Sequence, residues 1–207
     1  MLDTMMNQVP RMIVNVVQIL PMEALREVHR PSIGCELQKR FCSCLVLPEE
    51  NSTELQELRE INMDFQRKLE KLLLSDRFFK QDFAVVLQPY LQHTQPPRLP
   101  DGNIDLSFFT ADCFHFRVKG HEELAKGLWN NMFQPEGKKE YVETFSDPVK
   151  LICPPKDHPF LYTRPSVLSA GPPLTQATML ILLPVLTMSA LTSVNTRTES
   201  VQKWLAC

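Results

Sequence analysis

The segment Met12-Ile13-Val14-Asn15-Val16-Val17-Gln18-Ile19-Leu20 is almost entirely apolar and rich in β-branched residues. Pro10 precedes it and Pro21 follows it, so both of its ends are well bounded. A short apolar run of this length fits a strand that is buried on both faces, as in a parallel sheet. The segment therefore predicts one strand of a parallel α/β sheet.

The rest of the first 163 residues alternates between strand and helix patterns. Phe83–Pro89 predicts a second buried strand, and residues 120–133 predict a helix. Residues 21–33 are expected to contain a short helix, and Cys35–Pro48 reads as a loop pinned by cysteines. The order strand, helix, strand, loop, helix is typical of an α/β fold with a parallel sheet and flanking helices.

The clearest helix pattern covers residues 53–74. Thr53 and Gln56 fit a capping box at its start. Apolar residues recur at spacings of three and four, which predicts a stripe facing the core. The stripe consists of Leu55, Leu58, Ile61, Phe65, Leu69 and Leu72.

Residues 164–207 differ in composition, with frequent Ser, Thr and Pro. Leu174–Val194 carries no charged side chain, which makes it a weak candidate for a membrane segment. Pro184 interrupts it, and the alternative interpretation is a poorly ordered tail. We therefore expect one domain over residues 1–163 and a separate tail over residues 164–207.

The overall composition argues against some classes of protein function. The chain has 207 residues, a net charge of −2 and no basic stripe, which argues against a nucleic-acid-binding protein. Six cysteines, an even number, suit an oxidising compartment, but their spacing fixes no pairing. The start, Met1–Pro10, lacks the basic and apolar regions of a secretory leader, which by itself favours a cytoplasmic location.

The segment Asp112-Cys113-Phe114-His115 is the candidate for a catalytic acid–base pair. A histidine base needs a carboxylate that fixes its tautomer and stabilises the imidazolium, and an acid three residues away on a turn can do this. The blander alternative is an ordinary surface pair. A zinc site formed by Cys113, His115 and His121 is a further alternative, although no fourth ligand has a suitable spacing.

Several ordered segments of residues 1–163 carry a resemblance to a known family. They are Val9-Pro10-Arg11, Gln81-Asp82-Phe83-Ala84-Val85-Val86 with Gln88-Pro89, Phe108 to His115 with Lys119-Gly120-His121, and Cys153-Pro154 with His158-Pro159. Together they resemble the C-terminal part of one catalytic repeat of the membrane-associated phospholipases B, in the GDSL/SGNH lipase family.

This resemblance implies an incomplete SGNH-hydrolase-like parallel sheet and a carboxylic ester hydrolase that uses Ser-His-Asp acyl transfer. Asp112 would be the acid and His115 the general base, while His121 would pack at a helix start. The implied substrates are phospholipids, lysophospholipids and other lipid esters, with no cofactor and no metal. The implied location is the secretory route and the apical plasma membrane.

The sequence departs from the family pattern at the nucleophile. It contains no Gly-Asp-Ser, no Gly-x-Ser-x-Gly and no Gly-x-Asn-Asp block that would supply an oxyanion hole. We therefore expect a truncated chain that is inactive alone, and the alternative is a non-catalytic isoform or interaction fragment. A partial sheet would also leave the Met12–Leu20 strand with an unpaired edge and the helix over residues 53–74 short of packing surface.

Overall fold

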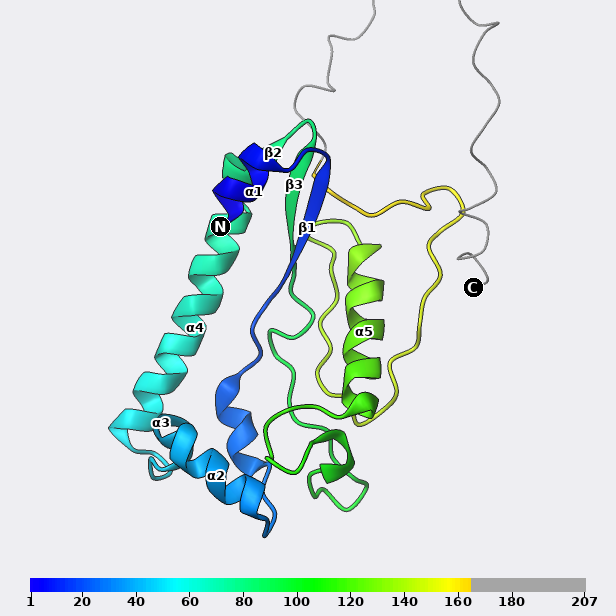
Figure 1. Ribbon diagram of the computed structural model, residues 1–207. Helices are drawn as coiled ribbons and strands as arrows, with labels where there is room; N and C mark the ends of the chain where they lie inside the picture. Colours follow the sequence, from blue (N-terminus) through cyan, green and yellow to red (C-terminus); the bar gives the residue numbers. More distant parts are fainter. Residues whose placement is uncertain (165–207) are drawn as a thin grey trace, which may run out of the picture. The chain divides into compact units, whose positions relative to one another are not determined.

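Two parallel strands form the centre of the fold. The computed structural model describes residues 1–164. Strand β1 (Met12–Val17) pairs in parallel with β3 (Phe83–Gln88), which confirms both predicted strands and their orientation. The short β2 (Phe79–Lys80) pairs antiparallel on the other side of β3, so the sheet is mixed and its order is β1-β3-β2 (Figure 1).

The two long strands differ in burial. All six residues of β3 are buried, as expected for a central strand. In β1 the pattern is only half-buried, and Ile13 is 47% exposed. The prediction that β1 is buried on both faces is therefore wrong. It lies at the edge of the sheet, and within residues 1–164 it has a strand neighbour on one side only.

Helix α4 (Thr53–Leu73) and helix α5 (Val118–Met132) lie on opposite sides of the sheet (Figure 1). Both were predicted, to within about two residues. The cap of α4 is Ser52 and not Thr53, because the Ser52 hydroxyl accepts the Leu55 N–H at 3.2 Å.

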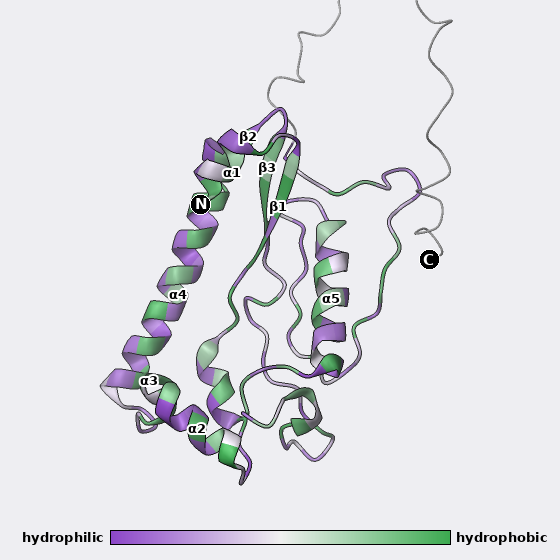
Figure 2. Ribbon diagram, viewed as in Figure 1, coloured by the Kyte–Doolittle hydropathy of each residue, from purple (hydrophilic) through white to green (hydrophobic). Residues whose placement is uncertain are grey.

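The apolar stripe of α4 is only partly covered. Leu55 of the predicted stripe is buried; Leu73, which was not part of that stripe, is also buried and packs with Phe83, Val85 and Leu87 of β3. Three other members of the predicted stripe remain substantially exposed: Ile61 (60%), Phe65 (54%) and Leu72 (38%). Figure 2 shows hydrophobic and hydrophilic residues alternating along α4. The expected shortage of packing surface on this helix is therefore present in the described residues.

Gln66 fixes the position of α4 relative to both long strands. This buried side chain donates from Nε2 to the carbonyl of Ile19 at 2.8 Å and to the carbonyl of Gln92 at 3.1 Å. Ile19 follows β1 and Gln92 follows β3, so one amide group holds the helix against the chain that leaves both strands.

The segment between β1 and α4 is helical. A 3₁₀-helix, η1, covers Met22–Glu27, where a short helix was expected. The prediction of a loop over Cys35–Pro48 is wrong, because α2 (Ile33–Phe41) and α3 (Ser43–Val46) occupy most of it. Ser32 caps α2 by accepting the Cys35 N–H at 3.2 Å, an arrangement typical of helix starts.

Three short elements complete the described chain: α1 (Leu2–Gln8), η2 (Asp76–Phe78) and η3 (Leu106–Phe108). One buried cluster joins η1, α2, α3 and the chain around η3, and it forms the base of the candidate site. It comprises Leu25, Val28, Cys35, Leu45, Tyr90, Leu91, Phe108, Phe109, Cys113 and Phe145. The predicted tail lies outside the described residues, except for Arg164.

Candidate active site

The Asp112/His115 turn is closed at its base by paired phenylalanines. Phe109 and Phe116 form an antiparallel bridge, and their rings stack with centroids 5.2 Å apart. Inside this bridge, the Thr110 N–H donates to the His115 carbonyl at 2.8 Å. The local sequence thus folds back on itself, and the six residues between the phenylalanines project as one compact turn.

Asp112 organises this turn through its Oδ1 atom. That oxygen accepts the backbone N–H groups of Phe114 and His115, each at 3.1 Å, and the hydroxyl of Thr110. Partial burial opposes ionisation, but these hydrogen bonds and the His115 ring outweigh it and hold the pKa of Asp112 well below its ordinary value. Asp112 is therefore an ionised acceptor at neutral pH.

The second carboxylate oxygen of Asp112 meets the imidazole of His115. Oδ2 lies 2.6 Å from Nδ1. Because ionised Asp112 can only accept, the Nδ1–H must be the donor, which leaves Nε2 of the neutral ring with its lone pair. The His115 side chain is 72% exposed, so this lone pair is open to a ligand. The structure thus joins the two residues singled out in the sequence in the geometry that an acid–base pair requires.

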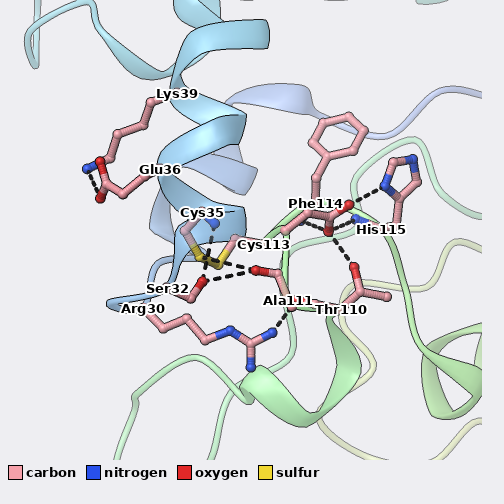
Figure 3. Close-up of a disulfide and its surroundings, with 11 residues drawn as sticks. Arg30, Ser32, Cys35, Glu36, Lys39, Thr110, Ala111, Cys113, Phe114 and His115 are labelled. Carbon is pink, nitrogen blue, oxygen red and sulfur yellow. Dashed lines mark hydrogen bonds and ion pairs between the residues drawn. A yellow bond between two sulfur atoms is a disulfide. The ribbon is translucent and has the colours of Figure 1, made fainter.

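A disulfide anchors the turn from behind. Cys113, between Asp112 and His115, is bonded to Cys35 of α2, with 5.2 Å between the two Cα atoms (Figure 3). Both cysteines are almost completely buried. Cys113 has a φ of 60°, a left-handed conformation that is uncommon for residues other than glycine. The pairing had not been predicted, because six cysteines allow many combinations.

Three further contacts join the turn to the start of α2 and to the residues just before it. The Ser32 hydroxyl donates to the Ala111 carbonyl at 3.0 Å, and the Arg30 guanidinium donates to the Thr110 carbonyl (Figure 3). Gly34 lies so close that a Cβ there would be 2.3 Å from the Ala111 oxygen. None of these three residues was predicted from the sequence. Ser32 alone offered a signal, because serine is a common helix N-cap and its hydroxyl accepts from the amide three residues later, here that of Cys35.

A cavity of about 340 Å³ opens beside the pair. Leu37 and Phe41 of α2 line one side, and Asp112, Phe114 and His115 line the other. The Phe114 ring meets the imidazole edge-on, with centroids 5.2 Å apart. The His115 imidazole therefore lies at a mainly apolar cavity, of the kind in which the hydrocarbon part of a ligand is favoured.

The zinc alternative loses a ligand in this arrangement, because the sulfur of Cys113 is committed to the disulfide. Within residues 1–164 no group of three or more metal-ligating side chains comes together. His121 lies in the first turn of α5, with its ring edge-on to Phe116 at 6.4 Å. This contact agrees with packing at a helix start.

No nucleophile accompanies the pair in the described part of the chain. There, Asp112 is the hydrogen-bonding partner of the His115 ring, and no serine or threonine hydroxyl reaches it. The sequence likewise contains no Gly-Asp-Ser.

Comparison with known proteins gives three matches of equal strength. The chain is similar to "Phospholipase B1, membrane-associated" of Homo sapiens, with 39% identity over 166 residues. The same-named proteins of Mus musculus and Rattus norvegicus match at 39% identity over 166 and 167 residues. Each match covers 78% of this chain. The chain is related to phospholipase B1.

These phospholipase B1 relatives are much longer proteins, since the match covers 11% of each. This chain thus corresponds to about a tenth of their length. No family model matches the chain, and no solved structure matches it.

The relatives are named as membrane-associated. Among the helices of residues 1–164, none combines the length and apolarity needed to cross a bilayer. The candidate membrane segment, Leu174–Val194, lies outside the described residues.

Proposed function

We propose that Asp112 and His115 are the acid and the general base of a lipid ester hydrolase of the phospholipase B type, within the GDSL/SGNH lipase family. The observation that carries this proposal is the 2.6 Å contact between Asp112 Oδ2 and His115 Nδ1 at an apolar cavity. The relationship to phospholipase B1 supports phospholipids and lysophospholipids as the substrate class.

In this chemistry Nε2 of His115 takes the proton of a serine hydroxyl, and the alkoxide attacks the ester carbonyl. His115 then returns the proton to the leaving alcohol, and water hydrolyses the acyl-enzyme by the same route. Asp112 holds the tautomer and stabilises the imidazolium. This chain supplies two of the three groups, so we propose that it is inactive until a segment carrying Gly-Asp-Ser joins it.

The first experiment treats the purified full chain with a short-chain p-nitrophenyl ester, a lysophospholipid and a fluorophosphonate probe for active serines. We expect no turnover and no labelling. Turnover that persists in His115→Ala would contradict the proposed role of His115.

The second experiment co-expresses the chain with a segment of a phospholipase B1 relative that carries the nucleophile motif. We expect esterase activity that His115→Ala abolishes and that Asp112→Asn lowers by roughly 10⁴-fold, since the amide favours the wrong tautomer. A stable complex without activity, or activity that tolerates both substitutions, would reject the assignment.

A second candidate function is that of a non-catalytic interaction fragment. It is favoured by the edge of β1 that has no strand neighbour within residues 1–164, together with the exposed residues Ile61 and Phe65 of α4. Strand edges of this kind pair readily with other polypeptides. A complex that forms through β1 and has no activity under any condition would favour this reading.

The disulfide bears on the compartment. A buried Cys35–Cys113 bond is typical of proteins that fold in an oxidising environment. We therefore propose the secretory route, in agreement with the membrane association of the relatives and against the cytoplasmic location that the N-terminal residues alone had suggested. Thiol alkylation of the chain isolated from cells under non-reducing conditions tests this: Cys35 and Cys113 should be protected.

A further inference from the structure

Helix α2 turns large apolar side chains toward solvent. Ile33 is 82% exposed, Leu37 46% and Phe41 84%. They follow one another at intervals of four, so they share one side of the helix, while Cys35 and Gln38 are buried on the other side. We refer to Ile33, Leu37 and Phe41 as the α2 apolar face.

This face is continuous with the candidate active site. Leu37 and Phe41 also line the cavity of about 340 Å³ that contains Phe114 and His115. An apolar ligand bound across the α2 apolar face would therefore reach the imidazole without leaving hydrocarbon surroundings. The disulfide from Cys35 to Cys113 holds the face and the base in fixed relation.

A positive charge lies on the same side of the helix. Arg40 is seven residues after Ile33 and three after Leu37, which places it beside them. It is exposed and, within the described residues, forms no ion pair, whereas its neighbour Lys39 is paired with Glu36 at 2.8 Å. An unpaired guanidinium next to exposed hydrocarbon complements a surface that presents phosphate groups above acyl chains.

We propose that the α2 apolar face docks on a phospholipid surface, with Ile33, Leu37 and Phe41 entering the acyl boundary and Arg40 among the phosphates. The mouth of the His115 cavity then opens toward the lipid. The choice of occupant rests on the proposed function, but docking itself requires no catalysis. Its test therefore measures binding alone and can succeed or fail independently of ester hydrolysis.

The test is co-sedimentation of the full chain with phosphatidylcholine vesicles, and with vesicles in which part of the phosphatidylcholine is replaced by phosphatidylserine. Ile33→Ser and Phe41→Ser should each lower the partition coefficient by about tenfold, since each removes a large apolar group from the lipid. The matched control is Phe65→Ser on α4, a 54% exposed phenylalanine on another helix, which should bind as the unaltered chain does.

The charge is tested separately. Arg40→Gln should weaken binding to vesicles that contain phosphatidylserine more than binding to phosphatidylcholine alone. Lys71→Gln, an exposed lysine in the last turn of α4, serves as the matched control and should have little effect.

The depth to which the α2 apolar face enters the lipid is measured directly with Phe41→Trp, and Phe65→Trp is the control. The unaltered chain already contains two tryptophans, so its quenching by brominated lipids is subtracted; the emission added at position 41 should be quenched, and that added at position 65 should not. Equal binding by the chain and both serine variants would overturn the proposal. So would an α2 apolar face that forms a dimer interface instead, shown by a dimer that Phe41→Ser dissociates without any change in vesicle binding.

Discussion

Gly34 and Ala111 are in closer contact than any other residue type at position 34 would permit. A Cβ on Gly34 would lie 2.3 Å from the Ala111 carbonyl oxygen and 3.0 Å from the amide nitrogen of Asp112. The neighbouring atoms are backbone, so they cannot move aside as a side chain would. The position of the acid therefore depends on the absence of one methyl group on the facing helix.

Gly34→Ala should destabilise the protein by about 1–3 kcal/mol through this overlap. On an exposed helix the same change would stabilise by up to about 1 kcal/mol, so the sign of the effect is diagnostic. Denaturant unfolding gives the free energy, and the ¹⁵N shifts of the His115 ring report whether the contact with Asp112 survives. An increase in stability with an unchanged ring would show that the helix and the turn are not in contact.

Removal of the disulfide should lower the free energy of unfolding by more than Gly34→Ala does. Cys35 and Cys113 are 78 residues apart, and a bond that closes a loop of this size stabilises by about 4.5 kcal/mol in the chain-entropy model. We expect a loss of this order for the Cys35→Ala/Cys113→Ala double variant in urea unfolding. Cys44→Ala, at an exposed free cysteine, is the control and should unfold as the unaltered chain does. If native Cys35 reacted with a thiol reagent before reduction, the bond would be absent in solution.

Acid should weaken the fold partly through Asp112. The hydrogen bonds to its carboxylate lower its pKa in the folded state below the ordinary value of 3.8. Between these two values the unfolded chain binds more protons, so the free energy of unfolding increases with pH there and the contribution of Asp112 is lost on acidification. Urea unfolding as a function of pH measures this dependence. In Asp112→Asn the free energy of unfolding should change less steeply with pH below pH 3.8. An unchanged slope in the variant would show that other carboxylates account for the acid sensitivity.

Gln66 should be sensitive to substitution although it is remote from the site. In Gln66→Leu the partly buried carbonyls of Ile19 and Gln92 lose a donor, and an unsatisfied polar group costs up to about 1–3 kcal/mol when it is cut off from water. Thermal and urea unfolding should show this loss. The exposed Gln56→Leu on the same helix should change stability little, and equal effects of the two substitutions would mean that the buried contacts contribute nothing.

The edge of β1 that is unpaired in the described part of the chain should promote self-association. Ile13→Lys places a charge on this half-exposed strand, and edge charges oppose pairing between molecules. We expect slower aggregation by light scattering at unchanged secondary structure. Ile152→Lys, at a 50% exposed isoleucine outside the sheet, is the control, and equal protection by both would point to net charge in place of strand pairing.

Features that are determined within a single segment of the sequence could be predicted, and features that depend on contacts between distant segments could not. β1, β3, α4 and α5 follow from runs and periodicities that each lie within a single segment. The Asp112–His115 contact could also be predicted, since the two residues are only three positions apart and lie in one turn. The family resemblance anticipated that β1 would have no strand neighbour on one side within residues 1–164 and that α4 would lack some packing surface, but it did not indicate which residues of α4 would be exposed.

The errors have a common origin in contacts between distant segments. Cys35–Pro48, which contains most of α2 and all of α3, was interpreted as a loop because of its cysteines. The bond from Cys35 to Cys113 instead joins a helix to the Asp112/His115 turn. Ile61 and Phe65 fit a core-facing periodicity, but no described element covers them. Periodicity shows which residues could be buried together, and only the tertiary arrangement shows which are.

The covalent ring that the disulfide closes contains most of α2 and all of α3, α4, η2, β2, β3 and η3, while β1 and α5 lie outside it. A protease that cut the exposed chain near Lys80 or Gln81 would therefore open the ring without releasing either piece. The nicked molecule would keep Asp112 and His115 attached to α2 and would run as one band until a reductant was added. The candidate site would thus outlast a single cleavage between the two sequence segments that build it.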